Sequence, residues 1–151
     1  MNELVFRETA HADIESTYSI RAATRQNPIP KAQLIDWGFT PESVWEKYLQ
    51  GRYIGWVCED RGQVIGFCTG DALTGEVIVI ALLPRYEGRK IGSRLLTLLI
   101  GSLRDRGSGK IWLSASPDPE IRAHGFYRAN GWAPTGEVLA NGDEILVFPV
   151  F

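Results

Sequence analysis

Apolar residues recur along the chain with two spacings, one typical of helices and one typical of strands. The clearest helix is expected from Gly92 to Arg106, where leucine and isoleucine share one face and Gly107 follows as a terminator. An apolar run over Val77–Leu83 predicts a central strand that is covered on both faces and stops at Pro84. The other helices are expected at 11–24, 41–50 and 117–129, and the other strands at 4–8, 53–59, 64–69, 110–115, 132–138 and 144–151.

The order of these elements predicts one α/β (α+β) domain over residues 1–151. Strand, helix and strand over 76–115 are expected to form a parallel unit with a right-handed crossover. Turn signals at Asp60–Gln63 and Asn141–Asp143 predict antiparallel hairpins on either side of it. We therefore expect a mostly antiparallel sheet of about seven strands with a parallel centre and about four helices. The stretch 25–39 is rich in proline and in apolar residues, and it is expected to be irregular and to fold back over the domain.

Composition and charge narrow the classes of protein that fit. Sixteen Lys and Arg balance eighteen Asp and Glu, which argues against an extended nucleic-acid-binding surface. The longest apolar run is far shorter than the roughly 20 residues of a membrane-spanning helix. The first residues also lack the pattern of a secretion signal, so we expect a cytoplasmic protein.

The two cysteines, Cys58 and Cys68, fall in strand-like apolar runs and are expected to be free, buried thiols. With His11 and His124 they match no zinc-ligand spacing, so no metal site is expected.

A basic, glycine-containing turn leads into the helix that begins near Gly92. From Arg85 to Arg106 there are six Lys and Arg but only two carboxylates, although the whole chain has a net charge of −2. Free backbone N–H groups at the start of a helix favour anions, so this turn is a candidate phosphate site. Neither the NTPase loop nor the dinucleotide-binding fingerprint is present.

Two segments resemble the GNAT-type N-acetyltransferases. The hexapeptide Glu87–Gly92 resembles the family's Gln/Arg-x-x-Gly-x-Gly/Ala loop, in which backbone amides bind acyl-CoA. The segment Glu120–Trp132 resembles the family's A-x-x-F-Y-x-x-x-G-F/W pattern. The element order also agrees with the family fold. This chain departs from the pattern at Glu87, at Lys90, which replaces the first glycine, and at Glu120, where the family often has Asn. A carboxylate at Glu87 is expected to weaken the local positive field, and a side chain at Lys90 to limit the approach of a diphosphate.

The resemblance implies that acetyl-CoA is the acyl donor and that a primary amine of a small molecule or peptide attacks it directly. Tyr127 would be the general acid for the departing thiolate, and Glu76, at the start of the central strand, the general base, directly or through a water chain. A backbone N–H at the bend Leu82–Leu83 would hold the thioester carbonyl. The diphosphate would bind the amides of Arg89, Lys90, Gly92 and Ser93.

Other interpretations of the same residues stay open. Glu76 could simply end a strand in solvent, and Tyr127 could be a core tyrosine. The whole chain could be a catalytically inactive acyl-CoA-binding module, or, less favoured, the basic turn could dock an RNA or lipid phosphate. Acceptor recognition is assigned to residues 25–39, to the face of the helix expected at 41–50 and to the hairpin around Asn141. Within the first of these, Trp37 and Phe39 favour local core over substrate contact. Exposed edge strands at the C-terminus are compatible with a homodimer.

Overall fold

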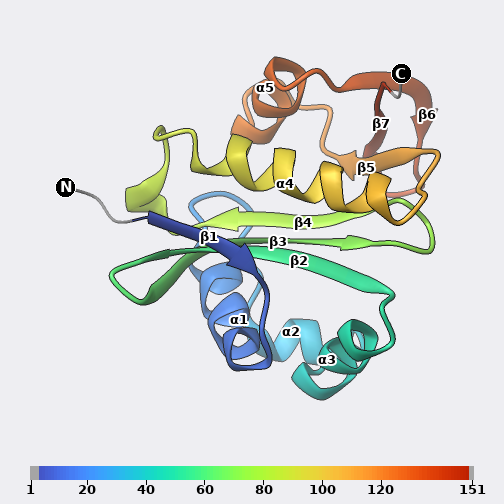
Figure 1. Cartoon of the computed structure of the whole chain (residues 1–151). Helices are drawn as coiled ribbons and strands as arrows, with labels where there is room; N and C mark the ends of the chain where they lie inside the picture. Colours follow the sequence, from blue (N-terminus) through green and yellow to red (C-terminus); the bar gives the residue numbers. More distant parts are fainter. Residues whose placement is uncertain (1–3, 150–151) are drawn as a thin grey trace.

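The computed structural model describes residues 4–149 (Figure 1). Its elements in chain order are β1 (Leu4–Glu8), the 3-10 turn η1 (His11–Asp13), α1 (Ile14–Ala23), α2 (Lys31–Asp36), α3 (Pro41–Leu49), β2 (Tyr53–Asp60), β3 (Gln63–Asp71), β4 (Val77–Leu82), the 3-10 turn η2 (Pro84–Tyr86), α4 (Ile91–Asp105), β5 (Ile111–Ala115), α5 (Arg122–Ala129), β6 (Ala133–Val138) and β7 (Glu144–Phe148). Among these described elements, none is a helix long and apolar enough to cross a bilayer.

The strands form two antiparallel sheets. One has the order β1-β2-β3-β4, and the other has the order β5-β7-β6. Figure 1 shows α4 on one face of the four-stranded sheet and α1, α2 and α3 on the opposite face. The expected α/β class, with mostly antiparallel strands, is therefore confirmed.

Helix α4 supplies much of the core because its apolar residues recur at helical spacing. Leu95, Leu99 and Leu103 are fully buried and pack against the strands. After Arg106 the chain turns through Gly107, and the N–H of Ser108 donates to the Leu103 carbonyl at 3.0 Å. This is the hydrogen-bond pattern by which a glycine ends a helix, as the sequence predicts. On the other face of the sheet, a second cluster buries Ile20, Val57, Phe67 and Ala81.

Strands β4 and β5 touch only where they begin. One parallel bridge joins Glu76 to Trp112, and the Trp112 N–H donates to the Gly75 carbonyl at 3.1 Å. Gly75 has φ +80°, and a Cβ there would overlap the Lys110 carbonyl oxygen, so the close approach needs glycine. Beyond the bridge the two strands belong to separate sheets. The expected parallel pairing is thus limited to this bridge.

The helices differ from expectation in two places. Residues 25–39, expected to be irregular, contain the short helix α2. None of its residues is buried, so the sequence has no apolar stripe from which this helix could be predicted. The helix expected over 117–129 begins only at Arg122, because the Glu120 N–H bonds the Asp118 side chain in a turn. Of the last strand, expected over 144–151, residues 150–151 lie outside the described part.

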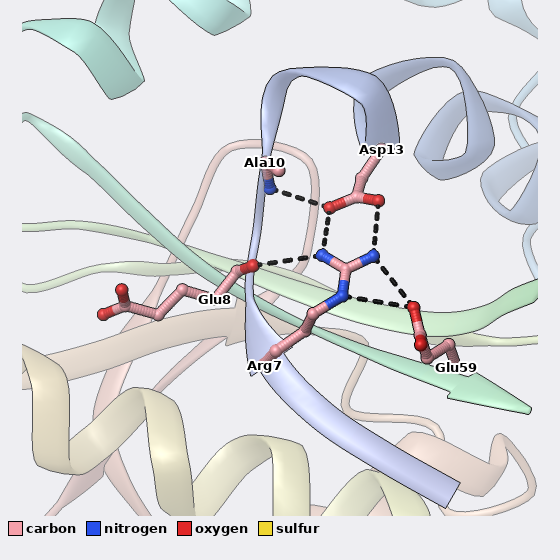
Figure 2. Close-up of polar contacts among 5 residues, drawn as sticks. All are labelled: Arg7, Glu8, Ala10, Asp13 and Glu59. Carbon is pink, nitrogen blue, oxygen red and sulfur yellow. Dashed lines mark hydrogen bonds and ion pairs between the residues drawn. The ribbon is translucent and has the colours of Figure 1, made fainter. Parts of the chain in front are cut away.

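A cluster around Arg7 ties β1, β2 and the entry to α1 together (Figure 2). The Arg7 guanidinium donates to Asp13 at 2.7 and 2.9 Å and to Glu59 at 2.9 and 3.1 Å. The Ala10 N–H donates to the same Asp13 carboxylate at 2.7 Å. Burial opposes the ionisation of Asp13, but these hydrogen bonds outweigh it and hold its pKa below the ordinary value.

We predict that Asp13→Asn lowers the free energy of unfolding at neutral pH by about 1–2 kcal/mol, because a charged hydrogen-bond acceptor is lost from a buried position. The pKa of Asp13 is lower in the folded chain than in the unfolded chain, where it is about 3.9. The stabilisation is therefore present above about pH 4 and is lost as the pH falls through the folded-state pKa. Urea unfolding of both proteins between pH 3 and 7 measures this difference.

The matched control is Asp36→Asn, since Asp36 is exposed on α2. It should change the free energy of unfolding by less than about 0.5 kcal/mol at any of these pH values. An Asp13→Asn protein as stable as the parent at pH 7 would show that the cluster contributes nothing to the fold.

Candidate functional site

A cleft of about 700 Å³ opens where β4 and β5 separate. Its walls come from the end of α1 and the loop after it, from β4, from the loop before α4, from the end of β5 and from α5. The polar residues that line it are Arg21, Thr24, Arg25, Gln26, Asn27, Glu87, Lys90, Ser93, Ser114, Ser116, Arg122, Tyr127 and Asp143.

The edge of β4 that faces the cleft carries free backbone groups. Leu83 donates its N–H to the Ile65 carbonyl of β3 at 2.9 Å, and Leu82 pairs with Gly66 in the register of β3 and β4. In an antiparallel pair, successive residues point their N–H groups alternately toward and away from the partner strand. The Leu82 N–H therefore points away from β3, to the edge where β5 has separated. Of the two donors expected at this bend, the Leu83 N–H is already bonded, whereas the Leu82 N–H has no partner within residues 4–149.

The loop before α4 presents consecutive amides. Within the described residues, no hydrogen bond uses the backbone N–H groups of residues 88–93, and the first helical one runs from Arg94 to Lys90 at 3.2 Å. Lys90 has φ +63°, the left-handed conformation that glycine adopts most easily. The lysine therefore keeps the backbone shape that the family's glycine would favour, and its side chain is exposed. Such a run of amides at a helix start is suited to an anion.

The carboxylate of Glu87 is neutralised by two arginines that also line the cleft. It forms ion pairs with Arg25 at 3.1 Å and with Arg122 at 2.9 Å. Arg25 comes from the loop after α1, and Arg122 opens α5, so Glu87 joins three segments around the cleft. The expected weakening of the positive field by Glu87 is thus countered by cations that the motif does not contain.

Tyr127 lies on α5 in the wall of the cleft. Its ring packs edge-on against Phe126 and Trp132, with centroids 5.3 and 6.0 Å apart. Burial raises the pKa of Tyr127 to about 12, and the positive charge of Arg21 opposes the shift. The phenol consequently keeps its proton at neutral pH. In the part of the chain that the structure describes, its hydroxyl has no hydrogen-bond partner.

Glu76 lies outside the cleft lining, at the bridge where β4 and β5 meet. It is half-buried, and burial, with a smaller effect from Asp71, raises the pKa of its carboxyl above the ordinary value. A proton could pass between Glu76 and the cleft only through an intervening group such as water.

The structure brings most of the predicted site residues together. Leu82, Lys90, Gly92, Ser93 and Tyr127 all line the cleft. Leu83, Arg89 and Glu76 are absent from its lining.

The side chain of Arg89 instead stacks over the Tyr86 ring, with its guanidinium carbon 5.2 Å from the ring centroid. Trp37, expected to be local core, is 57% exposed, and neither it nor Phe39 lines the cleft. Cys58 and Cys68 are free and buried, as expected, and neither is part of the cleft lining.

Sequence reasoning missed several polar residues of the cleft. Arg21 lies on a helix whose apolar stripe gave no reason to single out a cation. Arg122 belongs to the Glu120–Trp132 segment, but no motif position marked it. Residues 25–27 and Asp143 fall in two of the three regions assigned to acceptor recognition, although neither was named individually.

The sequence profile described as the acetyltransferase (GNAT) family matches residues 14–132. A curated relative, the [ribosomal protein bS18]-alanine N-acetyltransferase of Haemophilus influenzae, is 32% identical over 96 residues. That alignment covers 61% of this chain and 62% of the relative, so the chain spans somewhat less than two thirds of the relative's length.

Solved structures share the fold. The PaiA N-acetyltransferase of Thermoplasma acidophilum, in complex with coenzyme A, superposes with a TM-score of 0.80 at 17% identity, covering 98% of this chain and 99% of that one. The ribosomal-protein-S18-alanine N-acetyltransferase of Escherichia coli gives 0.71 at 19% identity, covering 98% and 94%. Because the family profile extends from the first residue of α1 to Trp132, three residues beyond α5, and so includes both motifs, the chain belongs to the acetyltransferase (GNAT) family.

Proposed function

We propose that this protein transfers an acetyl group from acetyl-CoA to a primary amine of a small molecule or peptide, by direct attack of the amine. The observation that carries the proposal is the cleft itself, in which the free edge of β4, the amides before α4 and Tyr127 line one cavity. Family membership supports it. A covalent route through a cysteine is disfavoured because burial raises the pKa of Cys58 to about 11 and that of Cys68 to about 12, which keeps both thiols protonated.

The cleft fits the donor molecule chemically. Acetyl-CoA supplies the acetyl group as a thioester, at the end of a long amide-containing arm that carries a diphosphate. We assign the diphosphate to the amides of residues 88–93 and the charge of Lys90. The amide-containing arm can pair with the edge of β4, since that edge lacks a strand partner beyond the bridge. Gly92 leaves room beside Phe126, whose ring would lie 3.3 Å from a Cβ at this position.

We assign the chemistry to three groups of the chain. The Leu82 N–H would donate to the thioester carbonyl as the amine forms a C–N bond and the C–S bond breaks. Tyr127 would donate to the departing sulfur. Full transfer of its proton is uphill, because a phenol pKa of about 12 exceeds the roughly 8.5 of a thiol, and the nearby charge of Arg21 reduces that gap. Glu76 would receive the amine proton through water.

Tyr127→Phe should lower kcat about a hundredfold, the lower end of what a general acid contributes, because the leaving sulfur loses its donor. The KM for acetyl-CoA should change little, and acetyl-CoA should raise the melting temperature of both proteins. Thiol release with a panel of primary amines measures the turnover.

Tyr53→Phe is the control, since Tyr53 is buried but does not line the cleft. Stabilisation of the parent by acetyl-CoA without turnover on any amine would favour an inactive acyl-CoA-binding module. If the parent shows neither effect, acyl transfer is the wrong function.

Glu76→Gln should lower kcat/KM about tenfold or more near pH 7, because an amine with a pKa of about 10 is almost fully protonated there and needs a base. A base works only above its own pKa, so the parent's rate should fall as the pH drops toward the raised pKa of Glu76. The deficit of the variant should shrink toward pH 10, where the amine loses its proton without help. Steady-state rates of the parent and the variant, from acidic pH up to pH 10, provide the measurement.

Glu137→Gln, on the exposed strand β6, is the matched control. Identical pH profiles for parent and Glu76→Gln would mean that Glu76 only ends a strand.

A further inference from the structure

Arg21 is a cation of the cleft that the proposed chemistry leaves without a ligand. It occupies the last turn of α1 and is only partly exposed. Its guanidinium donates to the Asn27 carbonyl at 2.8 Å, and its own carbonyl accepts from the Ile29 N–H at 3.0 Å. These two bonds fold the loop after α1 back along the cleft and hold the Arg21 side chain in its wall.

The other cations of the cleft either form ion pairs or lie at the proposed diphosphate site. Arg25 and Arg122 share the carboxylate of Glu87, and Lys90 lies at the loop of free amides. Within residues 4–149, no carboxylate forms an ion pair with Arg21. Arg21 is therefore the cleft arginine whose charge is balanced by no acidic side chain of the described chain.

Arg21 and Tyr127, to which we assign the departing sulfur, line the same cavity. The positive charge of Arg21 acts against the rise in the pKa of Tyr127. Burial lowers the pKa of the guanidinium without discharging it, because an arginine stays protonated at all ordinary pH values. A partly desolvated guanidinium is best compensated by a carboxylate, which can accept two parallel N–H bonds.

The lining of the cleft also includes an acidic side chain. Asp143, in the turn between β6 and β7, also lines the cavity. It forms no ion pair among the described residues, and its carboxylate accepts a hydrogen bond from the side-chain amide of Asn141 at 3.4 Å. The two walls thus offer a cation and an anion to one bound molecule.

We propose that the acceptor is an amine that carries its own carboxylate, such as a free amino acid, and that Arg21 binds this carboxylate while Asp143 faces the ammonium group. The inference rests on the proposed function and narrows its substrate class. A polyamine or an uncharged amine would leave Arg21 uncompensated, so such acceptors are expected to be poor.

The test compares acceptors with and without a carboxylate. Glycine with glycinamide, and L-alanine with L-alaninamide, are assayed by thiol release with saturating acetyl-CoA, beside spermidine and ethylamine. For the free amino acids, Arg21→Gln should lower kcat/KM by about ten- to a hundredfold, the loss expected for a hydrogen bond between charged groups. For the amides it should change kcat/KM by less than about threefold. The ratio of parent to variant cancels the different amine pKa values of the acceptors.

Two further variants separate binding from loop position. Arg21→Lys keeps the charge and should restore part of the rate with free amino acids. Arg104→Gln is the matched control, because Arg104 also lies in the last turn of a helix and donates to a backbone carbonyl, that of Pro149 at 3.3 Å, but outside the cleft. It should leave all acceptors unchanged.

The outcomes separate this inference from the proposed function. Turnover of ethylamine or spermidine at least as fast as of the free amino acids overturns the inference and leaves acyl transfer intact. So does an Arg21→Gln effect that is equal for acids and amides, or that falls on the KM for acetyl-CoA, since the arginine would then support the loop or the donor. No turnover of any amine, with no binding of acetyl-CoA in a thermal-shift assay, overturns both.

Discussion

The separation of β4 from β5 is the constraint on which the site depends. The strands are joined at Glu76 and Trp112 and then enter different sheets, so each presents an edge without a strand partner. Backbone N–H and C=O groups away from bulk water need hydrogen-bond partners, and an extended ligand that contains amides can supply them. The same opening makes the cavity into which α5 places Tyr127 and the loop before α4 presents its amides.

Charge around this opening is arranged in pairs rather than spread evenly. Glu87 takes two arginines and thereby ties the loop after α1 to the start of α5. Removing that carboxylate would release two cations into the cleft, so its value lies in holding the walls together as much as in cancelling charge. Arg21 stands apart because its partner is a carbonyl rather than a carboxylate. The cleft thus has a cation that no acidic side chain of residues 4–149 pairs with.

The elements with strong periodicity could be predicted from the sequence, because their side chains decide their structure locally. One example is the leucine face of α4. The Arg61–Gly62 turn between β2 and β3 is also determined locally, because both of its residues have positive φ. The apolar pattern alone could not indicate the split sheet, because an apolar strand has the same sequence pattern whether its edge is paired or free. Helix α2 lacks a buried face, and the ion pairs of Glu87 join residues 62 and 35 positions apart in the chain, which no local pattern encodes.

Amide hydrogen exchange, with and without saturating acetyl-CoA, tests the central claim most directly, because it reports on the backbone groups that the cleft leaves unpaired. Exchange should slow at Leu82 and across residues 88–93 when acetyl-CoA is present, while the exposed turn at Arg61 and Gly62 stays unchanged. Equal exchange at Leu82 and 88–93 in both conditions would contradict the account, because the ligand would then bind elsewhere or not at all.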